Sequence, residues 1–328
     1  MAQADQWLGA QRIAKWTGLG SCTVILIGML IAYFILQPAA LSDSTVVSLS
    51  NSALPLVMAA AAETVVLIGG GIDLSVGVVM SLVSVIVATE MDSSVGSMLF
   101  WTVAAIGVGC SVGLLNGLLV EYAHVNAFIA TLATMEVIQG LALGVLGSPG
   151  GQVPAGFETG TQGTSFHYVP NALLIILGVM LLYAIARRVR SFRWIYAVGS
   201  DRQAARTSGI RDRRVVIGSY VLCGAIAAVG GLTLSGLLSS GDPIEGGTFL
   251  LPGIAAAVIG GTSVFGGKGG VPGSVAGAFI LTVLASVLFA ANVTPFYEAF
   301  FTGLATVLIV GIGVTIDRYT SSRAARWS

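Results

Sequence analysis

Charge is the scarcest property of this chain. Only 9% of its 328 residues are Asp, Glu, Lys or Arg, while 55% are hydrophobic and the mean hydropathy is +0.92. A soluble domain needs more polar surface than this composition supplies. The scarcity of charge therefore excludes an ordinary water-soluble protein and indicates one that lies mainly in lipid.

Cysteine and histidine are also rare. Cys22, Cys110 and Cys223 lie inside apolar runs without paired or metal-ligand spacing, so they predict packing residues and no disulfide framework. His124 and His167 are not spaced as a metal site. No cluster of nucleophile, base and metal ligands can be assembled, which argues against a membrane-embedded enzyme.

Positive charge is absent from residues 16–186 and then concentrated. Nine of the fifteen Lys and Arg residues fall within 187–214, and the others stand near the two ends, apart from Lys268. Cations are retained on the cytoplasmic side of membrane proteins. This pattern predicts that both termini and the 187–214 segment are cytoplasmic. The segment is short and tethered to the membrane on both sides, so nucleic-acid binding gains little support.

Long apolar runs predict an all-α, polytopic membrane helix bundle that forms a single domain over residues 1–328. With about 20 residues needed for each crossing, ten spans are expected, at 17–36, 52–70, 75–89, 98–120, 126–147, 171–186, 215–238, 250–266, 272–291 and 296–316. The third and sixth are short enough to be tilted, broken or re-entrant. The first run is longer than a signal-peptide core, so we expect it to remain as an anchor.

Glycine is abundant, with 44 residues. Small residues let membrane helices approach closely, and paired glycines also end helices. The clusters at 69–71, 230–231 and 260–261 fit either role. Gly260 and Gly261 are therefore candidate pathway or gate residues, with tight packing as the alternative.

A few polar residues stand inside or beside the apolar runs. Asp73 either caps a helix that begins near Ser75 or lines a cytoplasmic gate. Asn116, like Glu63, Glu136 and Gln139, either lines a polar path or bonds to a neighbouring helix. Asp73, Ser75 and Asn116 join the two glycines as pathway candidates. The external segment 148–170 is either a mobile loop or a rim that a solute-binding protein contacts.

The arginine-rich segment contains a predicted short helix. Residues 200–203 (SDRQ) have the capping-box pattern, with Ser200 as the cap, and Gly209 stands where a helix of about eight residues would end. So short a helix is marginal in water unless a partner groove supports it. The alternative is a solvated turn whose arginines only fix topology or meet anionic lipid.

Four stretches together resemble a known family. They are residues 70–77 (GGIDLSVG), 113–117 (GLLNG), 195–210 (IYAVGSDRQAARTSGI) and 254–267 (IAAAVIGGTSVFGG). Each is similar to a stretch of the permease subunits of ATP-binding-cassette sugar importers of the ribose, xylose and galactoside class, and they occur in family order. Family members often carry an acidic pair just before the last stretch, where this chain has Leu250 and Pro252, so no role of those acids is carried over.

The resemblance implies a multi-pass protein of the bacterial inner membrane that passes a small sugar or related polar solute. It implies three partners: a cytoplasmic ATPase that holds ATP and Mg, a periplasmic solute-binding protein, and a second permease copy that is either identical to this chain or a related one. It also implies that 187–214 is the cytoplasmic coupling loop, with ATPase contacts at Gly199, Ser200, Asp201, Ala204, Ala205, Arg206, Ser208 and Gly209. This chain lacks a phosphate-binding P-loop, so we expect neither a cofactor nor ATP hydrolysis in it.

An ion-gradient-driven secondary transporter is the principal alternative. It would pair ionisable groups near the middle of the membrane, and Glu63 with Glu136 is the pair this sequence offers.

Overall fold

The computed structural model describes residues 22–40, 42–166 and 168–294, together with 297, 300, 301, 303, 304 and 307. This part of the chain is mainly helical, with one two-stranded antiparallel sheet. After the helix Cys22–Leu36, the elements are η1 (Pro38–Ala40), α2 (Asp43–Ile68), α3 (Val76–Glu90), α4 (Val95–Glu121), α5 (Ala127–Val145), α6 (Ala155–Gln162), β1 (Thr164–Ser165), β2 (Val169–Pro170), α7 (Asn171–Ala186), α8 (Arg190–Ser200), α9 (Arg202–Thr207), α10 (Asp212–Leu238), η2 (Glu245–Phe249), α11 (Leu250–Ile259) and α12 (Val271–Ala290).

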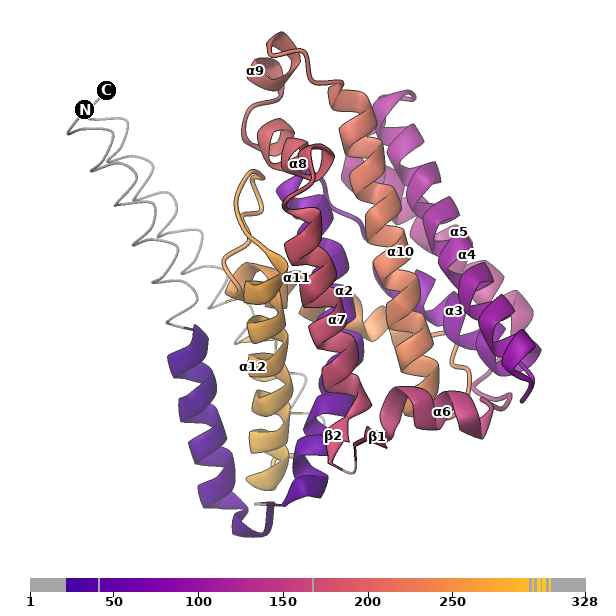
Figure 1. The fold of residues 1–328 in the computed structure, drawn as a ribbon, viewed down its shortest axis with the longest axis vertical. Helices are drawn as coiled ribbons and strands as arrows, with labels where there is room; N and C mark the ends of the chain where they lie inside the picture. Colours follow the sequence, from indigo (N-terminus) through magenta and orange to yellow (C-terminus); the bar gives the residue numbers. More distant parts are fainter. Residues whose placement is uncertain are drawn as a thin grey trace, which may run out of the picture.

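α2 forms the centre of the bundle. Every residue in 53–68 is buried, and α7, α10, α11 and α12 all pack against this helix (Figure 1). A helix that is apolar on every face is the kind that other helices surround. Alanines at 59–62 keep the surface of α2 narrow, so its neighbours approach closely on several sides.

α4 and α10 form the most extensive helix pair in the described chain. Gly109 and Gly113 on α4 face Gly224 and Tyr220 on α10. A Cβ atom at Gly109 would overlap the Gly224 carbonyl oxygen, and one at Gly224 would overlap the carbonyl oxygen of Gly109. Backbones this close require glycine, so the two helices are held by direct main-chain packing.

Two of the three glycine clusters end helices and the third does not. Gly70 and Gly261 have φ values of +83° and +85°, and they follow the ends of α2 and α11. Gly230 and Gly231 instead lie within α10 and pack against Met80 of α3. Gly230 and Gly231 therefore serve tight packing, which is the simpler of the two expectations.

The structure bears out an all-α membrane bundle but does not confirm ten spans. Five described helices are long and apolar enough to cross a membrane, namely α2, α4, α5, α10 and α12, and the bent pair α7 and α8 makes six. Three shorter apolar helices are Cys22–Leu36, Val76–Glu90 and Glu245–Ile259. The predicted 250–266 span stops at Ile259 because Gly260 and Gly261 end the helix. Most of the predicted 296–316 span lies outside the described residues.

The two ends of the bundle carry different structures (Figure 1). α8 and α9 cover one end, and α6 with the β1–β2 hairpin lies at the other. At the α6 end, Gly150 pairs with Gly241, and Asn51 on α2 donates a hydrogen bond to the Gln162 carbonyl at 2.7 Å. The described part of the 148–170 segment is thus tied to the bundle by backbone and side-chain hydrogen bonds.

Candidate functional site

α8 turns sharply away from the membrane-spanning helices. It is bent by 82° from α7, across a break of three residues that begins at Arg187. Ile195 and Val198 are buried against the bundle, whereas Arg190 and Arg193 are exposed. This amphipathic helix keeps its arginines out of the apolar core.

α9 begins one residue later than the capping-box pattern predicts. Asp201 is the N-cap, and its Oδ1 accepts a hydrogen bond from the Ala204 amide at 2.9 Å. Ser200 is instead the last residue of α8 and donates to the Tyr196 carbonyl at 2.8 Å. α9 also ends earlier, at Thr207, so it has six residues rather than about eight. Gly209 has a φ of +80°, the left-handed conformation that terminates helices.

One face of α9 is buried and the other is free. Gln203, Ala204 and Thr207 are exposed, as are Ser208 and Gly209 after them. Ala205 is only 5% exposed and packs in the core cluster that contains Val198 and Val216. Ala205 therefore anchors α9 to its own chain, and the surface offered to a partner lies on the residues around it.

Four charged side chains bind α9 to two long helices. We call Glu121, Arg202, Arg206 and Asp212 the ionic cluster. Arg202 donates to Glu121 at the end of α4 and, at 2.7 Å, to Asp212 at the start of α10. Arg206 donates twice to Asp212, at 2.6 and 3.2 Å. The hydrogen bond to Asp212 raises the pKa of the Arg206 guanidinium.

The ionic cluster is anchored on its acidic side. The side chains of Glu121 and Asp212 are 2% and 8% exposed, against 44% for Arg202. A buried carboxylate is tolerated when charge-assisted hydrogen bonds compensate its desolvation. The sequence carries no direct sign of this cluster, because Glu121 lies 81 positions from Arg202. A carboxylate at the last position of the otherwise acid-free α4 was the available signal.

Three of the family-like stretches meet at the end of α8, in what we call the glycine junction, made by Ile68, Gly199, Gly266 and Gly267. The Gly267 amide donates to the Ile68 carbonyl at 2.9 Å. A Cβ at Gly199 would overlap that same carbonyl oxygen, and one at Gly266 would lie 3.1 Å from the Gly70 Cα. The junction therefore joins the ends of α2 and α8 to the loop that precedes α12.

Asp73 caps the entry to α3. Its Oδ1 accepts from the Ser75 amide at 2.9 Å, from the Ser75 hydroxyl at 2.6 Å and from Asn116 Nδ2 at 3.1 Å. Asp73, Ser75 and Asn116 are each at most 1% exposed. The structure thus brings three of the predicted pathway residues together, as a closed hydrogen-bonded cluster that links the α2–α3 break to α4. Gly260 lies elsewhere, with its backbone against Gly273 of α12.

The acids of the secondary-transporter alternative are not brought together. Glu63 is fully buried on α2, whereas Glu136 is exposed on α5. Gln139, three residues after Glu136, donates to the Pro243 carbonyl at 2.7 Å. Both carboxylate oxygens of Glu63 lack a hydrogen-bond partner within the described residues. The pairing that an ion-coupled mechanism requires is therefore not formed by these two side chains.

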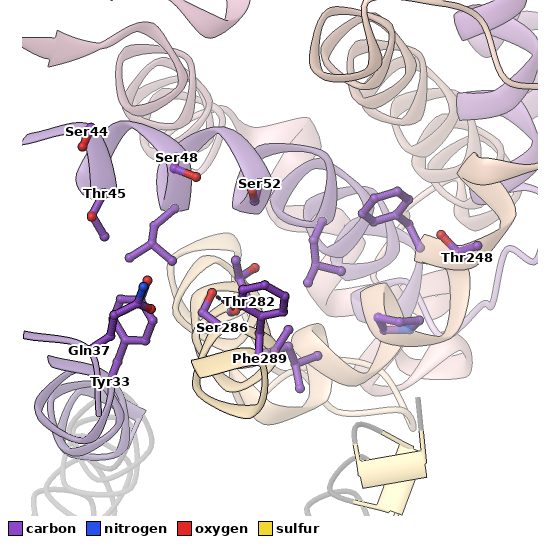
Figure 2. Close-up of a pocket in the computed structure, with 16 residues that line it drawn as sticks. Tyr33, Gln37, Ser44, Thr45, Ser48, Ser52, Thr248, Thr282, Ser286 and Phe289 are labelled. Carbon is purple, nitrogen blue, oxygen red and sulfur yellow. Dashed lines mark hydrogen bonds between the residues drawn. The ribbon is translucent and has the colours of Figure 1, made fainter. Parts of the chain in front are cut away.

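A cleft with a mixed polar and apolar lining opens on the side of the bundle where the helix Cys22–Leu36 faces α2 and α12 (Figure 2). Its volume is about 740 Å³. Seven of the residues that line it carry a Ser or Thr hydroxyl, namely Ser44, Thr45, Ser48, Ser52, Thr248, Thr282 and Ser286. Tyr33, Gln37, Phe249 and Phe289 add aromatic rings and one amide, and the rest of the lining is apolar, namely Leu49, Leu56, Pro252, Leu281 and Ala285. The predicted pathway residues are not among its lining.

The cleft lies toward the end of the bundle opposite α9, because it uses the first half of α2 and the second half of α12 (Figure 1). Ser44, Ser48 and Ser52 recur every four residues and so share one face of α2. Thr282 and Ser286 do the same on α12. Such i, i+4 hydroxyl patterns were the sequence signal for this cleft.

No group of three His, Cys, Asp or Glu residues that could hold a metal ion occurs among the described residues. His167 lies outside them.

Residues 45–310 match the family described as "Branched-chain amino acid transport system / permease component". The chain belongs to this permease family. Its relatives include the ribose import permease protein RbsC of Bacillus subtilis, 33% identical over 95% of this chain and 94% of that protein. The fructose import permease protein FrcC of Rhizobium meliloti is 32% identical over 81% of this chain and 75% of that protein. A probable ABC transporter permease protein, y4mJ of Sinorhizobium fredii, is 34% identical over 87% and 85%.

No solved structure matches this permease. The family match covers nearly all of α2 to α12, so it includes α8 and α9, the glycine junction and most of the cleft. It confirms the resemblance seen in the four stretches and supports a multi-pass permease subunit over an ion-coupled transporter.

Proposed function

We propose that this permease passes a neutral sugar or related polyhydroxylated solute inward across the bacterial inner membrane, driven by a separate ATPase subunit. The observation that carries the proposal is the similarity to ribose and fructose import permeases over most of both chains. The ATPase supplies ATP and Mg, and this chain supplies the path.

The exposed face of α9 is the proposed ATPase contact. Ala204 and Ser208 present small side chains, and Gln203 and Thr207 present polar ones, next to exposed arginines. α9 has only six residues and would be marginal alone. The ionic cluster and Ala205 supply the missing support, so a push on α9 reaches α4 and α10 directly.

Transport requires that ATP favour one facing of the path over the other. Docking that is equally strong in both states shifts nothing. We therefore propose that ATPase closure moves α8 and α9 together, and that the glycine junction transmits this motion to the ends of α2 and α11. The Asp73 cluster, which lies at the break between α2 and α3, is the proposed cytoplasmic gate.

The remaining partners follow from the family. A periplasmic solute-binding protein delivers the solute to the end that carries α6, and a second permease copy completes the path. Both termini are proposed to lie in the cytoplasm with α9. The exposed apolar side chains of α4 and α5, such as Leu99, Val103 and Val137, fit contact with lipid or the second copy.

Uptake into proteoliposomes tests this function. The permease is reconstituted with its ATPase and binding protein, and uptake of labelled ribose, fructose, galactose and leucine is compared. We expect uptake of at least one sugar that requires ATP and survives a protonophore. Uptake that needs no ATP and collapses with the proton gradient would instead establish the secondary transporter.

A further inference from the structure

We propose that the cleft between the helix Cys22–Leu36, α2, η2 and α12 is a binding site for the entering solute, and that it takes a neutral polyhydroxylated molecule. This inference rests on the proposed transport function and adds the location and chemistry of the site.

Charge separates the two substrate classes that the comparisons suggest. The family carries the name of an amino acid system, whereas the similar proteins import sugars. A zwitterionic amino acid presents an ammonium and a carboxylate, which need charged or strongly polar partners when they leave water. None of the sixteen described residues that line the cleft is Asp, Glu, Lys, Arg or His. The lining therefore favours a neutral solute.

Hydroxyl groups suit a ligand that is itself covered with hydroxyls, because each both donates and accepts a hydrogen bond. Ser48 and Ser52 lie on one wall of the cleft and Thr282 and Ser286 on the facing wall (Figure 2). Thr282 and Ser286 donate to carbonyl oxygens of their own helix and keep their acceptor capacity. Within the described chain, the side chains of Ser48, Ser52 and Gln37 have no hydrogen-bond partner, so each can both donate a hydrogen bond to a ligand and accept one from it.

Aromatic side chains line the cleft beside the hydroxyl groups. The Tyr33 and Phe289 side chains face the same space in Figure 2, and Phe289 is 72% exposed. An aromatic ring packs well on the apolar C–H face of a sugar ring while the hydroxyls at its edge reach polar groups. A lining of hydroxyls and rings thus recognises both surfaces of a sugar.

Size and position agree with this occupant. A volume of about 740 Å³ lies inside the range of roughly 300–1,000 Å³ that is typical of small-molecule sites. The cleft lies toward the end of the bundle opposite α9 (Figure 1). A solute that enters from the periplasm would reach the cleft first, before ATPase-driven motion of α9 opens the cytoplasmic end of the path.

Uptake by cleft variants is the first test. In the reconstituted importer we compare three proteins: the wild type, the double variant Ser48→Ala/Ser52→Ala, and Ser52→Trp. The ribose-loaded binding protein is saturating, so that the maximal uptake rate reports on the permease. Loss of two hydroxyls should lower the maximal rate about 3- to 10-fold. Ser52→Trp should reduce it more than about 10-fold by filling the space. Ser50→Ala is the matched control, because Ser50 is buried on the same helix and bonds to the Val46 carbonyl.

Thiol labelling is the second test and needs no transport. Ser52→Cys should react with a charged, membrane-impermeant thiosulfonate, over the background of the three native cysteines, and ribose-loaded binding protein should slow the reaction. Reaction with a lipid-soluble maleimide alone would show that the cleft faces lipid. A disulfide between two copies would show that it is a subunit interface. Either result overturns the proposed site.

The two proposals fail differently. If the wild type takes up ribose in an ATP-dependent manner and Ser52→Trp does so at the same maximal rate, the cleft is not the binding site, although the proposed transport function still holds. ATP-driven uptake of leucine without any of the three sugars would overturn the sugar assignment itself and the cleft chemistry with it.

Discussion

Single residues decide how α9 is held. Asp212 accepts hydrogen bonds from both Arg202 and Arg206, and Asp212 is nearly buried while the arginines are about half exposed. Removing one partner of a buried ion pair leaves the remaining charge unpaired, which is costly in a buried site. The cost is smaller where the remaining side chain is exposed to water. The cluster is therefore a positioning device of moderate strength.

Asp212→Asn should loosen α9 without unfolding the bundle. Because the two arginines are partly exposed, we expect a loss of about 1–2 kcal/mol in the free energy of unfolding. ATP hydrolysed per solute transported should rise several-fold. The measurements are thermal unfolding in detergent and coupled uptake. Unchanged coupling in Asp212→Asn would show that the cluster does not position α9.

Arg206→Glu should uncouple transport while the permease stays in the membrane. The substitution places a third acid beside Glu121 and Asp212, with only Arg202 left to compensate within the cluster. Arg211→Glu makes the same charge change one residue before Asp212, at an exposed side chain, and should retain most uptake. Normal uptake by Arg206→Glu would count heavily against the coupling role.

Gly199→Ala should stop the glycine junction from closing. A Cβ at Gly199 overlaps the Ile68 carbonyl oxygen and approaches the Gly267 amide to 2.9 Å. We expect at least about a 10-fold loss of coupled uptake with normal membrane insertion. Gly218→Ala on α10 is the control, since nothing lies within 4 Å of its Cβ position and alanine favours helix. Full activity of Gly199→Ala would mean that the junction has more room than this packing allows.

Whole elements depend on how their ends are satisfied. α9 is too short to be stable through its own hydrogen bonds, so its cap and its tertiary contacts determine whether it forms. The same holds for α3, which starts at a glycine-rich break and is fixed there by the Asp73 cluster.

Asp201→Ala should destabilise α9 by about 1 kcal/mol, because the Ala204 amide loses its acceptor. The ratio of solute transported to ATP hydrolysed should fall, and Asp201→Asn should restore it because asparagine caps equally well. The readout is coupled uptake in proteoliposomes. A defect that asparagine does not repair would point to the charge of Asp201, in contact with the ATPase, instead of the cap.

At the scale of the whole molecule, charge is concentrated at one end of the bundle, and this separation predicts the orientation in the membrane. The arginines of α8 and α9 lie at one end, and the described helices between them and α6 carry few charges. Moving arginines across lipid is costly, so we expect the arginine-rich end of the bundle to remain on the cytoplasmic side of the membrane.

Labelling from each side of the membrane tests the orientation. Thr207→Cys on α9 and Thr159→Cys on α6 are both exposed positions at opposite ends of the bundle. A membrane-impermeant maleimide should label the first only in inside-out vesicles and the second only in right-side-out vesicles. Labelling of Thr207→Cys from the periplasmic side would overturn the topology and the proposed ATPase contact together.

The sequence by itself determined the membrane class, the all-α architecture and the family, but not the number of spans. These depend on local properties: hydrophobic runs about as long as the bilayer is thick, arginines kept out of lipid, and short stretches of family-like residues. The cap of α9 was placed one residue early, because Ser200 and Asp201 are both good N-cap residues and only the end of α8 chooses between them.

Only the tertiary structure decided which distant residues meet. Glu121 reaches Arg202 across 81 positions, Ile68 meets Gly199 and Gly267, and hydroxyls of α2 face those of α12. A single sequence carries the period of each helix but not the rotation and contact of one helix against another. Those follow from close packing of the whole bundle, and packing placed the ionic cluster, the glycine junction and the cleft.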